Sequence, residues 1–228
     1  MDGGVEEAFA AALRRLAMTR ILFDVRDHAG VEWKKVRLNH CSAFRLRKTM
    51  KTVYFITHPE VVIDPAVPVP CWPLSIQGLA RMRLLLRQPW VPQMTAVYCS
   101  TEQKASDGAA LLAAHLALPV SQVAELGEND RSATGYLPAP EFEKVVDQFF
   151  AHPAVSIRGW EPAAVAQPRI VRAVTAIIAQ DAASGAIAIV AHGGVGTLLL
   201  CALAGYALDR RYEQPGQGGG NYYAFDAQ

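Results

Sequence analysis

The sequence predicts an α/β fold in which a mostly parallel sheet is covered by helices on both faces. Strand-like apolar runs alternate with helical patterns through residues 50–228, and this alternation is typical of a parallel sheet with crossover helices. The chain has 228 residues, 51% of them hydrophobic, which is enough to bury the core of one ordinary domain. No apolar run approaches the roughly 18 residues that a membrane-spanning helix needs, so we expect no membrane interaction.

The first half of this domain is predicted to contain three strands and two helices, with a Pro-rich loop after the first strand. In chain order they are a strand at 53–57, the loop at 64–73, a helix at 76–87, a strand at 95–99, a helix at 102–117 and a strand at 120–126.

The second half is predicted to contain three helices and two further strands. The elements are helices at 140–151 and 162–181, a strand at 186–191, a helix at 194–205 and a last strand at 221–226. Pro168 lies inside the 162–181 pattern and predicts a kink or a break there, because proline cannot donate the helical hydrogen bond.

Two histidines stand where strands of this sheet are expected to end. His58 follows the strand at 53–57, and His192, with Gly193 and Gly194 after it, follows the strand at 186–191. Ligands of open α/β sheets bind beyond the carboxyl ends of the strands, so the two imidazoles can face one another there. One neutral imidazole can attack phosphorus while the second donates hydrogen bonds to the oxygens. The alternative is that each histidine is an ordinary packing or turn residue at a strand end.

Two polar residues follow the strand at 95–99. Ser100 is a plausible N-cap for the next helix, whose free N–H groups and positive dipole end would face the same crevice. Lys104, one turn into that helix, can add a cation there, or it is an ordinary solvated helix lysine.

Glu128 is the candidate proton donor, within a polar stretch at 126–135. A carboxyl group beside the bridging oxygen of a phosphate ester can protonate the departing alkoxide, and burial or neighbouring anions would raise its pKa toward the working pH. The alternative is a loop carboxylate that pairs with Arg131.

The order of these motifs resembles that of the histidine phosphatase superfamily, which contains the cofactor-dependent phosphoglycerate mutases. That family carries Arg-His-Gly at the first strand, then Leu-Thr-x-x-Gly, Ser-x-x-x-Arg-Ala, Leu-x-Glu and a final His-Gly. In this chain the matching segments are His58, Leu74-Ser75-Ile-Gln-Gly78, Ser100 with Lys104-Ala105, Leu126-Gly-Glu128 and His192-Gly193. The resemblance runs from about residue 53 to about residue 226 and implies a three-layer α/β/α sandwich of the phosphoglycerate mutase type.

The resemblance also implies roles for individual residues. His58 would be the phosphorylated nucleophile, Glu128 the proton donor and His192 a phosphate ligand. Lys104 would be the counterpart of the second phosphate-clamping arginine. Thr57 and Gly193, next to the two histidines, belong to the expected phosphate-binding set.

This chain departs from the family pattern at three positions. Thr57 stands where the family has arginine, Pro59 where it has glycine, and Lys104 where it has the helix arginine. Both guanidinium forks are therefore lost, and lysine is a hydrated point charge that does not replace a bidentate donor. Arg131 and Arg158 are the candidates for replacement anion contacts, although arginines are more usually surface residues.

The leading functional prediction is a phosphomonoesterase that needs no metal and no cofactor and acts on a small phosphorylated substrate. A binding or regulatory protein that has lost turnover on the same fold is the second possibility, because Thr57, Pro59 and Lys104 each weaken the clamp. A phosphotransfer mutase is the third. Neither the substrate nor the oligomeric state follows from the sequence.

Charge and cysteine content indicate which partners and which redox compartment to expect for the protein. Residues 50–228 contain twelve Lys and Arg against fifteen Asp and Glu, so no basic stripe for nucleic acid is expected. The four cysteines, at positions 41, 71, 99 and 201, show no metal-ligand spacing and are typical of reduced thiols in a cytoplasmic protein.

Residues 1–49 are interpreted as an extension outside the domain at 50–228. They contain ten Lys and Arg against six Asp and Glu, and Met50 opens the first strand as a native start commonly would. A wrongly assigned upstream start, a disordered or loosely docked arm and a targeting segment are the three interpretations, the last being disfavoured by early acidic residues. The opposite possibility is that residues 21–23 and 31–38 form strands docked on the domain.

Overall fold

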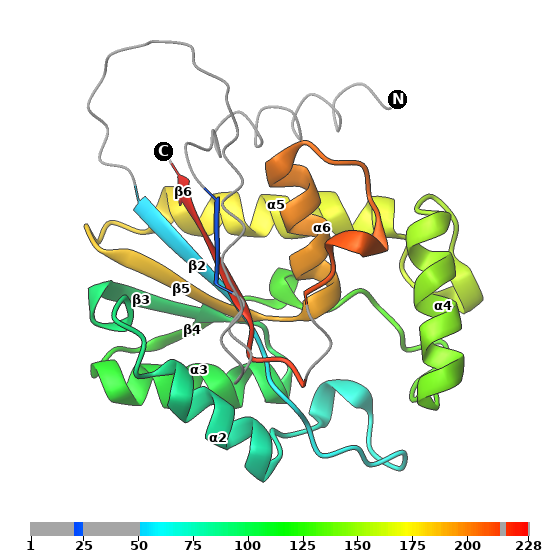
Figure 1. Ribbon diagram of the computed structural model, residues 1–228, viewed down its shortest axis with the longest axis horizontal. Coiled ribbons are helices and arrows are strands. Elements are labelled where there is room, and N and C mark those ends of the chain that lie inside the picture. The colour runs from blue at the N-terminus through cyan, green and yellow to red at the C-terminus, as the bar shows by residue number, and fades with distance from the viewer. Residues whose placement is uncertain (1–20, 25–50, 215–217, 228) are drawn as a thin grey trace.

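The computed structural model describes residues 21–24, 51–214 and 218–227. Within these ranges six strands form one sheet in the order β1-β6-β2-β5-β3-β4 (Figure 1). Strands β2, β5, β3 and β4 run parallel, whereas β6 is antiparallel to β2 and β1 is antiparallel to β6. The strands are β1 (Ile21–Asp24), β2 (Lys51–Thr57), β3 (Met94–Cys99), β4 (Val120–Gln122), β5 (Ala186–Ala191) and β6 (Tyr222–Ala227).

Helices cover both faces of the sheet, so the predicted three-layer α/β/α sandwich is confirmed (Figure 1). The pair α2 and α3 packs on one face, and α5 and α6 pack on the other with α4 beside them. Their bounds are α2 (Ile76–Leu85), α3 (Gln103–Leu116), α4 (Ala139–Ala151), α5 (Ala163–Gln180) and α6 (Gly193–Ala204). No helix in the described part of the chain is long and apolar enough to cross a membrane.

The pairing of the central strand β5 with β2 determines where the functional side chains leave the sheet. All six of its residues are buried, as expected for a strand covered by helices on both faces. Thr57 of β2 pairs with Ala191 of β5, and the N–H of His58 donates to the Ala191 carbonyl at 2.9 Å. The next residues along the two parallel strands are therefore His58 and His192, which leave the sheet side by side.

The loop after His58 is fixed by close packing against the start of α2. Ser75 caps α2 by accepting the N–H of Gly78 at 3.0 Å, and its hydroxyl donates to Glu60 at 2.8 Å. A Cβ on Gly78 would lie 2.1 Å from the Glu60 carbonyl oxygen, so only glycine fits there. The Leu-Ser-x-x-Gly motif at 74–78 thus holds the backbone beyond the nucleophile candidate.

Two local expectations need correction. The strand predicted at 120–126 ends at Gln122, and residues 124–126 form a 3-10 turn instead, which buries Leu126. The α5 helix continues through Pro168 without the predicted break. Pro168 is only the sixth residue of α5, so a single bond near the helix start is lost, and the apolar face of the helix remains packed.

Part of the N-terminal segment belongs to the sheet. Strand β1 pairs with β6 from Ile21 opposite Phe225 to Asp24 opposite Tyr222, which agrees with the possibility that residues 21–23 form a strand docked on the domain. The strand considered at 31–38 and the rest of the segment lie outside the described residues.

A chain that begins at Met50 is expected to fold with a thermal midpoint within about 5 °C of the full chain. Within the described part of the chain, truncation removes the four residues of β1, which lie at an edge of the sheet. Ordering the backbone costs about 1–2 kcal/mol per residue, which offsets much of what the pairing contributes. Calorimetry on both chains measures this, and a midpoint lowered by 10 °C or more on truncation would show that β1 is essential to the fold.

Candidate active site

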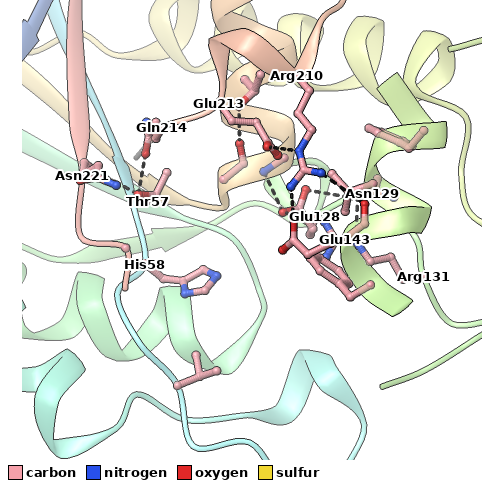
Figure 2. A pocket seen from close by; sticks show the side chains of 18 of the residues that line it. Thr57, His58, Glu128, Asn129, Arg131, Glu143, Arg210, Glu213, Gln214 and Asn221 are labelled. Carbon is pink, nitrogen blue, oxygen red and sulfur yellow. Dashed lines mark hydrogen bonds and ion pairs between the residues drawn. The ribbon is translucent and has the colours of Figure 1, made fainter. Parts of the chain in front are cut away.

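A cavity of about 420 Å³ opens beyond the carboxyl ends of β2 and β5 (Figure 2). It is bounded by the loop after His58, the loop at 128–131, helix α4, the start of α6 and residues 210–214 and 218–221. Of the residues predicted for the site, five line this cavity, namely Thr57, His58, Glu128, Arg131 and Gly193. The location agrees with the ligand position expected for an open α/β sheet.

The His58 ring is held in one tautomer. Its Nδ1 lies 2.8 Å from the carbonyl oxygen of Pro59, which has no proton to give, so Nδ1–H is the donor. The lone pair therefore remains on Nε2. Burial lowers the pKa of His58 and outweighs the Pro59 hydrogen bond, which raises it, so the ring is neutral at pH 7. A neutral imidazole with a free Nε2 is competent as a nucleophile.

His192 lies next to His58 and has one unpartnered nitrogen. The two ring centroids are 5.2 Å apart at an interplanar angle of 68°. The His192 ring is completely buried and is not among the residues that line the cavity. Its Nε2 lies 2.8 Å from the Ser100 hydroxyl, whereas Nδ1 has no hydrogen-bond partner in the described part of the chain. Burial lowers the pKa of His192 to about 3. A buried unpaired nitrogen is costly unless a ligand completes it.

Ser100 orients His192 and is not the N-cap of α3. The N-cap is Glu102, and the N–H of Glu102 donates to the Ser100 hydroxyl oxygen at 3.2 Å. Nε2 of His192 has two polar neighbours, the Ser100 hydroxyl at 2.8 Å and the Glu102 carboxylate at 3.3 Å, and these orient the ring.

Glu102 is a partly buried carboxylate that contacts several site residues, and the sequence patterns did not predict this role. Its carboxylate accepts the N–H of Glu128 at 2.9 Å, pairs with Lys104 and lies 3.3 Å from Nε2 of His192. Burial raises the pKa of Glu102, but the nearby His192 and Lys104 lower it further, so the net shift is downward. The carboxylate is therefore ionised and connects three parts of the site.

Lys104 is placed differently from the predicted phosphate clamp. Its side chain is 5% exposed, and its ammonium donates to the Val69 carbonyl at 2.9 Å and to Glu102. It does not line the cavity. A buried ammonium needs hydrogen-bonded partners, and Glu102 together with the Val69 carbonyl supplies them.

Glu128 occupies the N-terminus of α6. Its carboxylate accepts the N–H groups of Gly194 at 3.0 Å and Val195 at 2.9 Å, and Arg131 lies 3.2 Å away. Burial raises the pKa of Glu128, yet Arg131, His192 and the N–H donors lower it to about 2. The expected upward shift is therefore wrong for this state, because the pairing with Arg131 and the helix dipole outweigh burial.

The two candidate arginines have different positions. Arg131 lines the cavity, where Asn129 holds its Nε at 3.0 Å and its guanidinium packs over the rings of Phe142 and Trp160. Arg158 pairs with Glu141 and is 45% exposed outside the lining, so the structure does not bring it to the site.

Further lining residues carried no recognisable sequence signal. Arg210 forms ion pairs with Glu143, Asp147 and Glu213 on one wall of the cavity (Figure 2). Two carboxamides, Asn129 and Gln214, line the cavity with buried NH₂ groups that have no partner. Outside the lining, Arg169 of α5 donates to the carbonyls of residues 125, 127 and 128 and so positions the Glu128 loop.

At the start of α6, the backbone N–H of Gly193 is accessible from the cavity. A Cβ on Gly194 would lie 2.6 Å from the Glu128 carboxylate, so glycine is required for that contact. A Cβ on Gly193 would meet nothing within 4 Å, and Gly193 lines the cavity. Its N–H, at the first helical position, is one of those left free by the helical bonding pattern and can meet an anion.

A family model described as "Histidine phosphatase superfamily (branch 1)" matches residues 72–219 of the sequence, more than half of the chain. The match includes Ser100, Lys104, Glu128 and His192 and begins after His58. None of the curated proteins is similar enough in sequence to be matched.

Solved structures with the same fold include three that cover about three quarters of this chain. YhfR from Bacillus stearothermophilus has a TM-score of 0.62 at 22% identity and covers 76% of this chain and 90% of its own. Mycobacterial glucosyl-3-phosphoglycerate phosphatase has 0.62 at 17%, covering 76% and 89%. Phosphoserine phosphatase from Entamoeba histolytica has 0.62 at 13%, also covering 76% and 89%. At these identities the similarity shows the fold, which is of the expected phosphoglycerate mutase-like type.

Proposed function

Since the chain belongs to the histidine phosphatase superfamily, branch 1, we propose that it hydrolyses phosphomonoesters without a metal ion, through a phosphohistidine at His58. The observation that carries this proposal is the pairing of two ring nitrogens. Nε2 of His58 keeps its lone pair because Nδ1 is committed to Pro59, and the neighbouring His192 has an unpartnered Nδ1. One nitrogen is the nucleophile, and the other donates to a phosphoryl oxygen.

In the first step Nε2 of His58 attacks the phosphorus of a bound phosphomonoester. The nitrogen–phosphorus bond forms as the bond to the ester oxygen breaks, and the departing oxygen takes up a proton. Nδ1 of His192 and the N–H of Gly193 donate to the phosphoryl oxygens, where negative charge develops. Donors that are oriented before the charge forms need little reorganisation, and both proposed donors belong to buried or backbone groups of fixed orientation.

In the second step water attacks the phosphohistidine and releases orthophosphate, which restores neutral His58. Glu128 is ionised before substrate binds, so it is ready to accept a proton from that water. For the first step, the approaching phosphate dianion raises the pKa of Glu128 by like-charge repulsion, so that the carboxylate takes up a proton from solvent and passes it to the leaving oxygen. We therefore assign Glu128 to both proton transfers.

The charges around the cavity favour a substrate with a single phosphate. Four carboxylates line it, those of Glu60, Glu128, Glu143 and Glu213, against two guanidinium groups. Both arginines, Arg131 and Arg210, are already paired with carboxylates. A mutase must also bind a second anionic group, which belongs to the acceptor. The carboxylates that line this cavity would repel that group. The aromatic wall of Phe142, Phe149, Phe150 and Trp160 suits an uncharged, apolar or aromatic alcohol instead.

Incubation with a nitrophenyl phosphate should leave an acid-labile, base-stable phosphoryl group on His58. Mass spectrometry of protein quenched in alkali detects the modification and assigns the residue. His58→Ala should abolish both the label and any turnover, whereas His115→Ala, at an exposed histidine on α3, should keep both. Turnover that survives His58→Ala, or a label on another residue, would refute the proposed nucleophile.

Glu128→Gln should slow the first step much more for alkyl than for nitrophenyl esters. A nitrophenolate leaves without protonation, whereas an alkoxide needs the acid, which contributes about 100-fold or more. Rapid-mixing measurement of the alcohol released in the first turnover isolates this step from hydrolysis of the phosphohistidine. Glu125→Gln, an exposed neighbour in the same loop, is the matched control. Equal slowing of both esters would show that Glu128 is not the acid.

A further inference from the structure

The Gln214 side chain is anchored at one end and unpartnered at the other. Its Oε1 accepts the hydroxyl of Thr57 at 2.9 Å, and its Nε2 is buried without a hydrogen-bond partner among the residues that the structure describes. Gln214 lines the same cavity as His58, and Figure 2 shows the amide next to Thr57. A buried amide N–H without a partner costs about 1–3 kcal/mol, so a ligand oxygen that accepts from it would recover that free energy.

The Thr57 hydroxyl has two possible acceptors, the Gln214 amide oxygen and the Asn221 carbonyl. The residue is 3% exposed, its backbone N–H donates to the Asn221 carbonyl at 2.9 Å, and its hydroxyl lies 3.1 Å from that same oxygen. The hydroxyl has one proton for two acceptors, and the contact with Oε1 of Gln214 at 2.9 Å is shorter than the contact with the Asn221 carbonyl at 3.1 Å. Thr57 directly precedes His58, so the amide is tied to the strand end that carries the nucleophile candidate.

We propose that Gln214 is a phosphate-binding residue whose Nε2 donates to a phosphoryl oxygen, and that Thr57 is the positioning residue that orients it. The inference rests on the proposed phosphatase function and deepens it. Together the two residues supply a donor next to His58, where the family resemblance leads one to expect an arginine. The donor is neutral, so it holds the phosphoryl group without adding a charge that the neighbouring carboxylates would neutralise.

The neutral donor fits the electrostatics of this cavity. Arg210 lines the same cavity as Gln214, and it is bound to Glu143, Asp147 and Glu213. An additional cation here would join the same ion-pair network, as Lys104 joins Glu102 on the other side of the site. A carboxamide held through its oxygen competes less for these carboxylates and keeps its NH₂ group directed to the ligand.

Calorimetric titration with inorganic orthophosphate tests this proposal without depending on turnover. Gln214→Leu, which keeps the size and removes the donor, should weaken orthophosphate binding by about 10-fold to 100-fold, as expected for a hydrogen bond to a charged group. Gln214→Glu should weaken it by more, because it adds a like charge. Gln122→Leu, at an exposed glutamine on β4, is the control and should leave the affinity unchanged.

A double-mutant cycle separates positioning by Thr57 from a merely structural role. Thr57→Val should weaken binding about as much as Gln214→Leu, whereas Thr57→Ser, which keeps the hydroxyl, should restore wild-type affinity. The double variant should bind no worse than Gln214→Leu alone, because both changes remove one interaction. Additive losses in the double variant would overturn the positioning role of Thr57.

The outcomes also distinguish this inference from the proposed function. Unchanged affinity in Gln214→Leu, or tighter binding in Gln214→Glu, would show that the amide does not donate to phosphate and would overturn the inference even if phosphohistidine still forms on His58. Wild-type protein that fails to bind orthophosphate would overturn it as well. Failure of phosphohistidine formation alone would refute the proposed function and leave the binding result intact.

Discussion

The in-register pairing of β2 with β5 is the constraint on which the rest of the site depends. Thr57 opposite Ala191 places His58 and His192 at the same level of two neighbouring parallel strands. A shift of one residue would turn alternate side chains to the other face of the sheet and separate the two imidazoles. Every residue of β5 is buried between two helical layers, so such a shift would also expose the core. The same strand register is therefore required both for the packing of the core and for the geometry of the site.

Around the two histidines, charged groups are arranged in compensated pairs. Glu102 with Lys104 and Glu128 with Arg131 remove nearly all free charge from the immediate surroundings. Buried charges need such partners, since burying an isolated ion costs several kcal/mol. The remaining donors toward the cavity are neutral, namely ring, amide and helix N–H groups. A site of this kind binds a dianion mainly through oriented dipoles.

The sequence allowed the fold and the core of the site to be predicted because both depend on local patterns. Apolar runs gave the strands, and their ends gave His58 and His192. The position of Lys104 could not be predicted, because a helix beginning at 102 would place Glu102 and Lys104 on different faces. In the structure Glu102 is an extended N-cap with φ −71° and ψ 140°, which allows its carboxylate to reach Lys104. The contact of Gln214 with Thr57 joins residues 157 positions apart, and no local pattern announces it.

The tautomer of His58 tests the central claim most directly, since attack on phosphorus requires a free Nε2. Nitrogen-15 NMR of protein labelled in its histidine rings reports which nitrogen carries the proton, and His58→Ala assigns the signals. At pH 7 we expect a proton on Nδ1 of His58 and an unprotonated Nε2, and we expect the Nε2 resonance to shift when orthovanadate is added. A proton on Nε2, or an Nε2 signal that vanadate leaves unchanged, would contradict it.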